Sequence, residues 1–235
     1  MQKGKIYLIP SFLGESQANH VFPDFNREVI LATNHFLVEN LRTARRFLKA
    51  VESSINIDEL HFEILDKNTD EQIFSKYLTP VENGENIGII SEAGCPGIAD
   101  PGANLVALAH QKSIEVVPLI GPSSILLAQM ASGMNGQSFA FNGYLPIKGN
   151  ATANALQQLE RRSAQEKQSQ IFIEAPYRNM QIMELMLKTL SPSTLLCIAA
   201  DITGPQQFIK TKSVKAWKGQ LPSIHKVPAI FIIMA

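Results

Sequence analysis

Short apolar runs alternate with segments of helical periodicity through the first half of the chain, and this alternation restricts the possible folds most strongly. Five runs are predicted to be strands: 6–9, 35–39, 61–65, 87–90 and 114–120. The first of them is continuously apolar, the pattern of a strand buried on both faces. Four helices are predicted between them, at 23–32, 41–51, 70–78 and 103–111. Strands that alternate with helices form a parallel sheet with helices on both faces. We therefore expect an α/β domain with a parallel sheet over residues 1–118.

The second half, residues 119–235, is predicted to form a separate α/β domain. Strand candidates lie at 139–141, 171–174, 195–199, 207–209 and 229–233, and long helices are expected at 151–166 and 179–190. The connections between the last three strands are short and read as non-helical, which indicates antiparallel pairing and a mixed sheet. We expect a ligand to bind in a cleft between the two domains.

Residues 91–102 form the most unusual loop of the sequence. They follow an apolar run and precede a helix, and they hold three glycines, two prolines and two carboxylates. Glycine lets the main chain approach a ligand closely, and proline fixes the loop before anything binds. A connection that binds nothing usually needs about two to six residues, so the length favours a site. The loops after Ile9, Ile90 and Ile120 are all expected at the carboxyl edge of the sheet, where ligands bind in open α/β folds.

Composition restricts the class of protein and its surroundings. Apolar residues make up 45% and charged residues 18%, typical of a soluble globular protein, and 21 Lys and Arg balance 21 Asp and Glu. The net charge therefore gives no steering toward nucleic acid, although a local basic face stays possible. The two cysteines have no paired spacing, which favours a reduced, cytoplasmic compartment. The apolar stretch near the N-terminus, which Pro10 closes, is too short for the hydrophobic region of a signal peptide. No apolar run is long enough for a membrane span.

The sequence lacks the motifs of several common enzyme classes. The sequence contains no P-loop, no dinucleotide fingerprint and no zincin motif. The segment 121–125 lacks the second glycine of a nucleophile elbow. The five histidines are scattered, and we expect no metal site.

Five motifs occur in order along almost the whole chain: Ile-Tyr-Leu-Ile-Pro at 6–10, Ser-Glu-Ala-Gly-Cys-Pro-Gly-Ile-Ala-Asp-Pro-Gly at 91–102, Val-Pro-Leu-Ile-Gly-Pro-Ser-Ser at 117–124, Asn-Gly-Tyr-Leu-Pro at 142–146 and Glu-Ala-Pro-Tyr-Arg at 174–178. Together they resemble the tetrapyrrole methylase superfamily. Within it they are most similar to the bacterial enzymes that 2′-O-methylate a cytidine ribose in 16S ribosomal RNA. The motifs at 91–102 and 117–124 are the most specific.

This resemblance implies an S-adenosylmethionine-dependent methyltransferase of two α/β domains, usually a homodimer, with the cofactor in the cleft between the domains. The cofactor-binding residues that it implies are Leu13, Glu92, Ala93, Gly94, Pro96, Ile98, Ser123, Ser124 and Pro176. Methyl transfer from a sulfonium is an in-line displacement that needs alignment and no metal. The implied partner is ribosomal RNA or the small ribosomal subunit.

A ribose hydroxyl nucleophile gains from a general base, and the candidates are Glu39, Asp100 and Glu174. Two of them also have structural interpretations. Asp100 is equally suited to cap the helix that begins near Pro101, and Glu174 to anchor Arg178 through a turn.

The candidate substrate-binding residues are Arg42, Arg45 and Arg178. Arg42 and Arg45 belong to a basic face with Arg46 and Lys49 on the predicted helix 41–51. Such a face is usually only solvated, but four cations without an interleaved acid also suit contacts with phosphates.

The chain departs from its RNA-modifying relatives mainly on the acceptor side. Residues 38–42 are Val-Glu-Asn-Leu-Arg where these relatives usually have Ala-Glu-Asp-Thr-Arg, and Tyr177 stands where they have the histidine of Pro-His-Arg. Residues 200–204 are Ala-Asp-Ile-Thr-Gly in place of the usual Arg-Glu-Leu-Thr-Lys. A terminal Gly-Glu pair of the relatives is replaced near Val227. The sequence also ends at Ala235 without the helical tail of longer members.

These departures leave three hypotheses open. One is an RNA ribose methyltransferase. A second is an enzyme of the same fold that acts on a tetrapyrrole precursor or a protein side chain, although the loop at 10–14 lacks the glycine pattern usual in tetrapyrrole enzymes. The third is a non-catalytic relative that still binds the cofactor.

Overall fold

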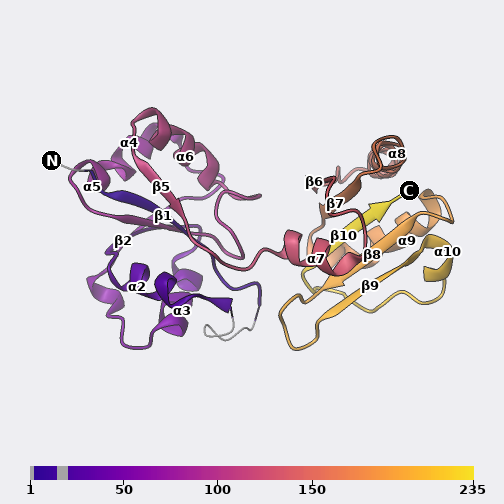
Figure 1. Ribbon diagram of the computed structural model, residues 1–235, viewed down its shortest axis with the longest axis horizontal. Helices are drawn as coiled ribbons and strands as arrows, with labels where there is room; N and C mark the ends of the chain where they lie inside the picture. The colour runs from indigo at the N-terminus through magenta and orange to yellow at the C-terminus, as the bar shows by residue number, and fades with distance from the viewer. Residues whose placement is uncertain (1–2, 15–20) are drawn as a thin grey trace. The chain divides into compact units, whose positions relative to one another are not determined.

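The computed structural model describes residues 3–14 and 21–235, and the chain divides into two compact units, Met1–Ser123 and Ser124–Ala235 (Figure 1). The sequence-based boundary lies at 118/119, at the end of the last strand of the first unit. None of the described helices has the length and apolar character needed to cross a lipid bilayer.

Unit 1 contains a five-stranded parallel sheet, as the sequence predicts. Its strands are β1 (Lys5–Ile9), β2 (His35–Val38), β3 (His61–Ile64), β4 (Ile87–Ile90) and β5 (Glu115–Pro118). They are arranged in the order β3-β2-β4-β1-β5, with every neighbouring pair parallel. The central strand β4 is buried along its whole length, which explains its uninterrupted apolar run.

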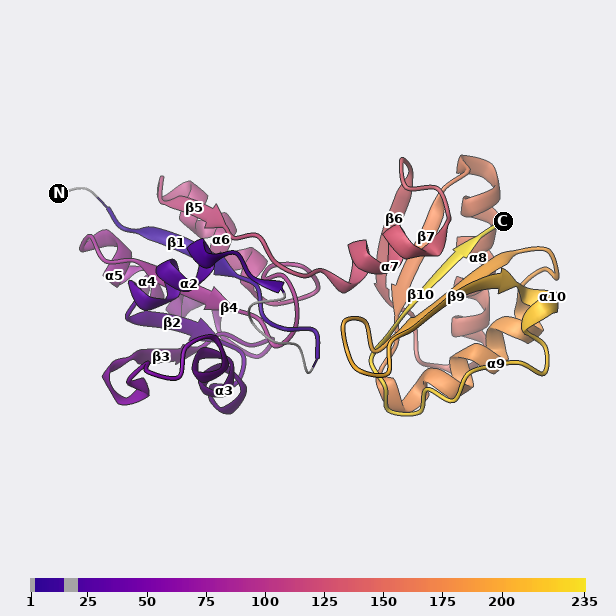
Figure 2. The same ribbon diagram turned by 60° about the horizontal axis from the view of Figure 1, so that its bottom comes forward.

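Helices cover both faces of this sheet (Figures 1 and 2). One face packs on α2 (Asp24–Leu31) and α3 (Leu41–Val51), through a core that includes Ile9, Phe36 and Leu48. The other face packs on α4 (Phe74–Tyr77), α5 (Thr79–Glu82) and α6 (Gly102–Gln111), through a core that includes Leu37, Ile87 and Leu105. A short 3-10 turn, η1 (Ile57–Glu59), precedes β3.

The segment 70–78 is helical, as predicted, but it is not one continuous α-helix. The segment consists of the 3-10 turn η2 (Glu71–Ile73) and the single-turn helix α4, and a further turn, α5, follows at Thr79. Leu78 joins α4 and α5 with φ −86° and ψ −7°. Pro80 has no N–H and is favoured only in a first turn, so it starts a new helix instead of continuing α4.

Unit 2 contains a mixed five-stranded sheet, which confirms the prediction of a mixed sheet in the second half of the chain. Its strands are β6 (Phe139–Tyr144), β7 (Ser169–Ile173), β8 (Leu195–Ala200), β9 (Phe208–Ser213) and β10 (Ala229–Met234), in the order β6-β7-β10-β8-β9. Only the β6–β7 pair is parallel, and the other three pairs are antiparallel. The predicted long helices are α8 (Gly149–Glu166) and α9 (Asn179–Thr189), which pack with Phe172, Leu196 and Phe231 in one core.

Two helices of unit 2 were missed in the sequence. The first, α7 (Ser124–Ser132), contacts β8, β9 and β10, and it is apolar on most sides, so it has no amphipathic pattern. The second, α10 (Val214–Trp217), lies between β9 and β10, so the prediction of only non-helical connections there is wrong. Its four residues are too few for a periodic signal, and Ser213 caps it by accepting a hydrogen bond from the Ala216 amide.

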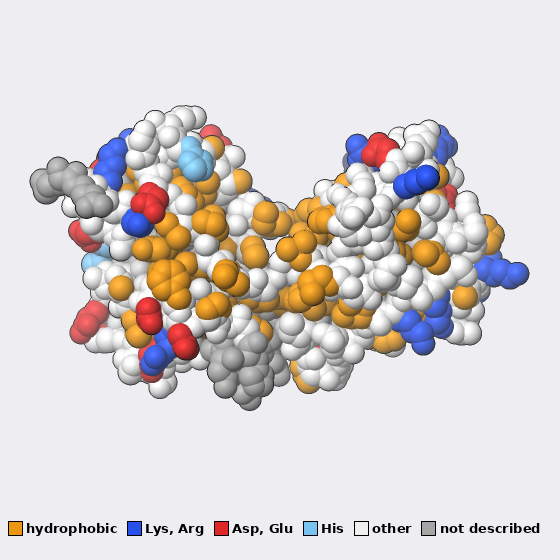
Figure 3. Space-filling model, in the orientation of Figure 1, with side chains coloured by type: hydrophobic (Ala, Val, Ile, Leu, Met, Phe, Trp, Pro, Cys, Tyr) orange, Lys and Arg blue, Asp and Glu red, His pale blue; other side chains and the backbone are white. Residues whose placement is uncertain are grey.

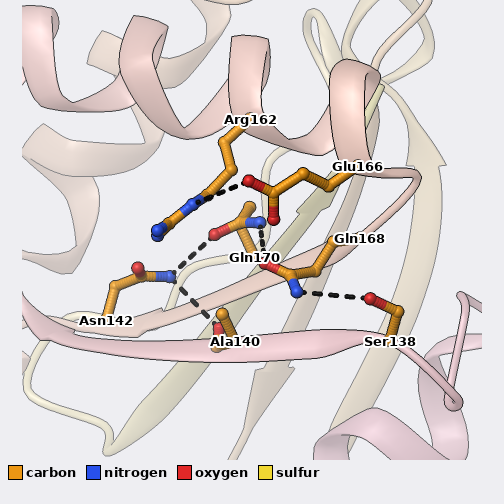
Figure 4. A network of polar contacts seen from close by, with 7 residues as sticks. All are labelled: Ser138, Ala140, Asn142, Arg162, Glu166, Gln168 and Gln170. Atoms are coloured by element: carbon orange, nitrogen blue, oxygen red, sulfur yellow. Dashed lines mark hydrogen bonds and ion pairs between the residues drawn. The ribbon is translucent and has the colours of Figure 1, made fainter.

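A series of hydrogen-bonded amide side chains lies where the register between β6 and β7 shifts (Figure 4). The register shifts between Phe141 and Tyr144, and Asn142 Nδ2 donates to the Gln170 side chain and to two backbone carbonyls. Gln170 in turn donates to Gln168, which donates to Ser138. The buried Gln170 is thereby hydrogen-bonded, and the motif at 142–146 has a structural role in this strand.

Candidate functional site

Three loops of unit 1 meet at one edge of the parallel sheet. The strands β4, β1 and β5 are adjacent and parallel, so the loops that follow them leave from the same edge. Ser11 and Gly94 exchange backbone hydrogen bonds with N···O distances of 2.9 and 3.3 Å. The Cys95 thiol donates to the Pro122 carbonyl, with an Sγ···O distance of 3.5 Å. The prediction that these loops share one edge is confirmed.

Close packing fixes the shape of the three loops. Gly94 has φ +79°, and a Cβ atom there would lie 3.2 Å from Leu13 Cδ2 and 3.5 Å from the Pro122 carbonyl oxygen. A Cβ on Gly121 would lie 2.4 Å from Pro10 Cβ, so only glycine permits this contact. Phe12 packs against Phe47 of α3, with ring centroids 5.1 Å apart. The loops are therefore held in place by the protein itself.

The predicted cofactor-binding residues are distributed over these loops and the start of unit 2. Glu92, Ala93 and Ile98 are exposed, whereas Gly94 and Pro96 are buried. Ser123 ends unit 1 and Ser124 begins α7. Pro176 begins the 3-10 turn η3 (Pro176–Arg178) in unit 2.

One exposed residue of this edge was missed in the sequence. Ile120 is 76% exposed, and its carbonyl accepts a hydrogen bond from the buried Asn26 side chain at 2.6 Å. The exposed side chains of Ile120 and Ile98 together give the loop edge an apolar surface. Gly97 has open space where a Cβ would stand. An adenosyl group and a thioether chain need apolar contacts and close backbone approach, so the residues fit S-adenosylmethionine.

A cavity of about 730 Å³ lies where β2, β3 and β4 end. Five of its lining residues are acidic, and Lys67 is the one cation among the described lining residues; the carboxylates are those of Glu39, Asp66, Glu71, Glu92 and Asp100. The loop after β3, which supplies Asp66 and Glu71, was not among the predicted site segments. Its position after a parallel strand was the available signal, because all loops that follow such strands open on the same edge.

Glu39 is the base candidate that this cavity supports best. It is half-buried, and Glu39 Oε1 accepts a hydrogen bond from the Glu92 amide at 3.0 Å. The hydroxyl of Thr43 donates to the Glu92 carboxylate, which ties the same two loops together again. Burial raises the pKa of Glu39; the Glu92 amide opposes this shift, and the charges of Asp100, Glu92 and Asp66 add to it.

Asp100 has a structural role close to the cap that the sequence allowed, although the N-cap residue of α6 is Pro101. Its Oδ1 accepts hydrogen bonds from the amides of Gly97 and Gly102, both at 2.8 Å. These bonds close the loop and satisfy an amide at the start of α6, as a helix cap does. Asp100 also lines the cavity, so it contributes to the negative potential there.

Asn40, which replaces the usual carboxylate, caps α3. Its Oδ1 accepts hydrogen bonds from the amides of Arg42 and Thr43 at 2.9 and 3.3 Å. Asparagine and aspartate are both strong N-cap residues. This departure therefore preserves the local structure.

Glu174 and Arg178 of unit 2 form an ion pair in which the carboxylate is buried. Arg178 Nη2 lies 3.4 Å from Glu174 Oε2, and the side chain of Glu174 is only 3% exposed. The Ala175 amide donates to Glu174 Oε1 at 2.8 Å. Glu174 therefore anchors Arg178, as the structural interpretation of the sequence held.

The four cationic side chains on the basic face of α3 are exposed. Arg45 lies over the ring of Phe62, with 5.6 Å from its Cζ to the ring centroid, and Lys49 donates to the Ser53 carbonyl. Arg42 and Arg46 make no ion pair with any residue in 3–14 or 21–235. Within the same ranges, no three His, Cys, Asp or Glu side chains are grouped to hold a metal ion.

The fold of this chain is similar to that of solved methyltransferases. The crystal structure of the methyltransferase CobJ matches with a TM-score of 0.65 over 98% of this chain and 94% of that one, at 16% identity. A uroporphyrin-III C-methyltransferase from Thermus thermophilus, complexed with S-adenyl homocysteine, matches with a TM-score of 0.59 over 98% of this chain and 97% of that one, at 13% identity.

Several sequence relatives are named Ribosomal RNA small subunit methyltransferase I. The protein from Pasteurella multocida is 32% identical over 184 residues, which cover 77% of this chain and 64% of the relative. The protein from Escherichia coli O157:H7 is 28% identical, over 86% of this chain and 66% of the relative. The resemblance inferred from the motifs is confirmed.

The chain spans less than two thirds of the length of the first three curated relatives, at 64%, 66% and 58%. A relative from Buchnera aphidicola subsp. Baizongia pistaciae is 27% identical. The alignment includes 99% of this chain and 76% of that relative. No protein-family model matches the chain.

Proposed function

We propose that this chain is an S-adenosylmethionine-dependent methyltransferase that methylates a ribose 2′-hydroxyl of ribosomal RNA. The observation that carries the proposal is the meeting of the loops after β1, β4 and β5 at one sheet edge. The names of the sequence relatives support RNA of the small ribosomal subunit as the substrate. The cytoplasm, where ribosomal subunits are found, is the proposed location.

The proposed cofactor-binding residues are those that the resemblance implies, with Ile120 added. When bound, the cofactor supplies a methyl group on a sulfonium, and a rigid site accelerates its in-line transfer by alignment. Leu13, Gly94 and Pro96 shape the loop edge, while the exposed Ile98 and Ile120 supply apolar contact.

Glu39 is the proposed general base. It accepts the proton of the ribose hydroxyl as the oxygen forms its bond to the methyl carbon and the carbon–sulfur bond breaks. Its half-buried carboxylate in an acidic cavity makes proton uptake more favourable than at an ordinary glutamate. Asp100 and Glu174 are proposed to have positioning roles, because their oxygens already hold a helix start and an arginine.

Arg42, Arg45 and Arg178 remain the proposed substrate contacts. Arg42 and Arg45 are exposed on α3, so both can reach phosphates in solution. Arg178 is held by Glu174 and lies partly along a groove between the start of α8 and α9.

A homodimer is the proposed assembly. On α7, Leu126 and Met130 are 51% and 79% exposed and are four residues apart, so they form one apolar face. We expect the wild-type chain to have the mass of a dimer in size-exclusion chromatography with light scattering, and Met130→Glu to shift it toward the monomer. A monomeric wild-type chain would exclude the dimer.

The test of the function is methyl transfer into small ribosomal subunits. Subunits from a strain that lacks the gene are incubated with the protein and S-adenosylmethionine labelled in its methyl group, beside subunits from the parent strain. We expect label in ribose of the RNA from the deletion strain and almost none in the parent. Label that enters only protein or a small molecule of the lysate would favour the second hypothesis.

A non-catalytic relative is the remaining alternative. It predicts cofactor binding in calorimetry without transfer to any fraction of the deletion lysate. The capping role of Asn40 weakens this alternative, because the replacement has a structural explanation that leaves Glu39 intact.

A further inference from the structure

The zero net charge of the chain conceals a strong division between the two units. Unit 2 contains 11 of the 21 Lys and Arg residues but only 5 of the 21 Asp and Glu residues, so its formal charge is +6 and that of unit 1 is −6. A polyanion is therefore attracted to unit 2 and repelled by unit 1 as a whole. The arginine face of α3 lies in the acidic unit.

The excess positive charge of unit 2 is concentrated near its C-terminal end. After Asp201 the sequence has no acidic residue, and it has five lysines: Lys210, Lys212, Lys215, Lys218 and Lys226. They lie on β9, on α10 and on the segment that leads to β10. All except the half-buried Lys212 are exposed. We call these five residues the lysine surface.

The lysine surface is built on a rigid support. Lys212 Nζ lies 4.9 Å from the centroid of the Trp217 ring and donates to the Gln220 side chain. Trp217 is 1% exposed, and its Nε1 donates to the Leu196 carbonyl at 2.8 Å. Lys210 and Lys212 are two residues apart on β9 and so share one face of the strand. The side chains thus extend from a well-packed sheet edge and helix.

Acidic side chains do not neutralise this surface. In the described part of the chain, none of the five lysines forms an ion pair with a carboxylate. Figure 3 shows Lys and Arg side chains, without Asp or Glu among them, over the lower right of unit 2, where β9 and α10 lie in Figure 1. An ordinary solvated surface carries both signs of charge interspersed.

We propose that the lysine surface binds the phosphodiester backbone of the RNA substrate. The inference rests on the proposed function for the identity of the polyanion as RNA. Lysine ammonium groups act as point charges on phosphates and read no base, so the surface holds the RNA without selecting its sequence. Selection of the methylated nucleotide is left to unit 1, which carries the proposed base Glu39.

The test compares two triple variants with equal loss of charge. Lys210→Gln, Lys215→Gln and Lys218→Gln remove the lysine surface, and Lys76→Gln, Lys148→Gln and Lys167→Gln remove three lysines elsewhere. Lys212 is kept because it packs on Trp217. Fluorescence anisotropy with a labelled single-stranded polyuridylate measures the Kd between about 50 and about 200 mM salt, and circular dichroism checks that each variant is folded.

We expect the surface variant to bind polyuridylate at least about ten times more weakly than the control variant. Its slope of log K against log salt becomes shallower by about 2, because each lost contact with a single strand removes about 0.7. Equal weakening in both variants would overturn the proposal, as would a wild-type chain that does not bind polyuridylate.

Methyl transfer separates this proposal from the proposed function. If the wild-type chain binds polyuridylate through these lysines but methylates no ribosomal RNA, the surface stands and the function fails. If the surface variant methylates small subunits with an unchanged KM, the function stands and the surface is excluded as the site of substrate binding.

Discussion

Glu39 combines access to a cavity with an environment that favours its protonated form. Glu39→Gln removes the proton acceptor but keeps the oxygen that accepts the Glu92 amide. We expect the methyl-transfer rate to fall by about 10² to 10⁴, the usual contribution of a general base. Cofactor affinity, measured by calorimetry, stays unchanged. Asp100→Asn is the matched control, and a larger loss of rate there than in Glu39→Gln would assign the base to Asp100.

The raised pKa of Glu39 also predicts how rate and stability depend on pH. A base must be ionised, so the wild-type rate decreases as the pH falls through a pKa above the ordinary value of 4.5. A carboxyl whose pKa is raised by folding stabilises the protein below its unfolded pKa, and this contribution is lost as the pH rises through the folded pKa. We therefore expect Glu39→Gln to have a higher Tm than wild type at neutral pH. A Tm difference that grows on acidification would contradict this.

At the scale of elements, α3 depends on its N-cap. Asn40→Ala removes the acceptor for the amides of Arg42 and Thr43, so unit 1 should lose about 1 kcal/mol of stability. Asn40→Asp retains the cap and restores the carboxylate of the relatives, so its loss should be smaller. Urea unfolding followed by circular dichroism is the suitable measurement, because the single tryptophan lies in unit 2. Equal losses in both variants would contradict the capping role.

Gly94 connects the loops at the sheet edge. Gly94→Ala forces a side chain into a backbone with φ +79° and into contact with Leu13, so we expect at least about tenfold weaker cofactor binding. Gly133→Ala is the matched control, since its φ is +71° and nothing lies within 4 Å of its added Cβ. The two substitutions share the backbone strain, and only the first disturbs the loops. Equal effects on cofactor affinity would contradict a specific role for Gly94.

Elements were predictable from the sequence where burial imposed a period. The fully buried β4 and the one-sided α3 have clear patterns, and their positions agree with the structure. The helix α7 has apolar residues on most sides, and α10 is a single turn, so neither leaves a periodic trace. The loops after β1, β4 and β5 were predictable because parallel strands all end at one edge. The loop after β3, which helps to line the acidic cavity, was missed because it has no glycine-rich motif, although its position after a parallel strand placed it at the same edge.

At the scale of the whole molecule, the division of charge assigns different tasks to the two units. Unit 1 carries the glycine loops and an acidic cavity, and unit 2 carries a surface for a polyanion. The total charge could not reveal this division, because it becomes visible only when charges are counted on each side of the boundary at Ser123. Since the wild-type charges attract RNA to unit 2, raising the salt concentration should increase the KM for small subunits while leaving cofactor affinity almost unchanged.

The meeting of the three loops at one sheet edge is tested most directly by locating the cofactor on the chain. Ultraviolet cross-linking of radiolabelled S-adenosylmethionine, followed by peptide mapping, identifies the residues in contact with it. We expect saturable labelling in the peptides that contain Leu13, residues 91–102 and residues 120–124, and competition by S-adenosylhomocysteine. Saturable labelling confined to peptides outside these loops, or labelling that S-adenosylhomocysteine does not displace, would contradict it.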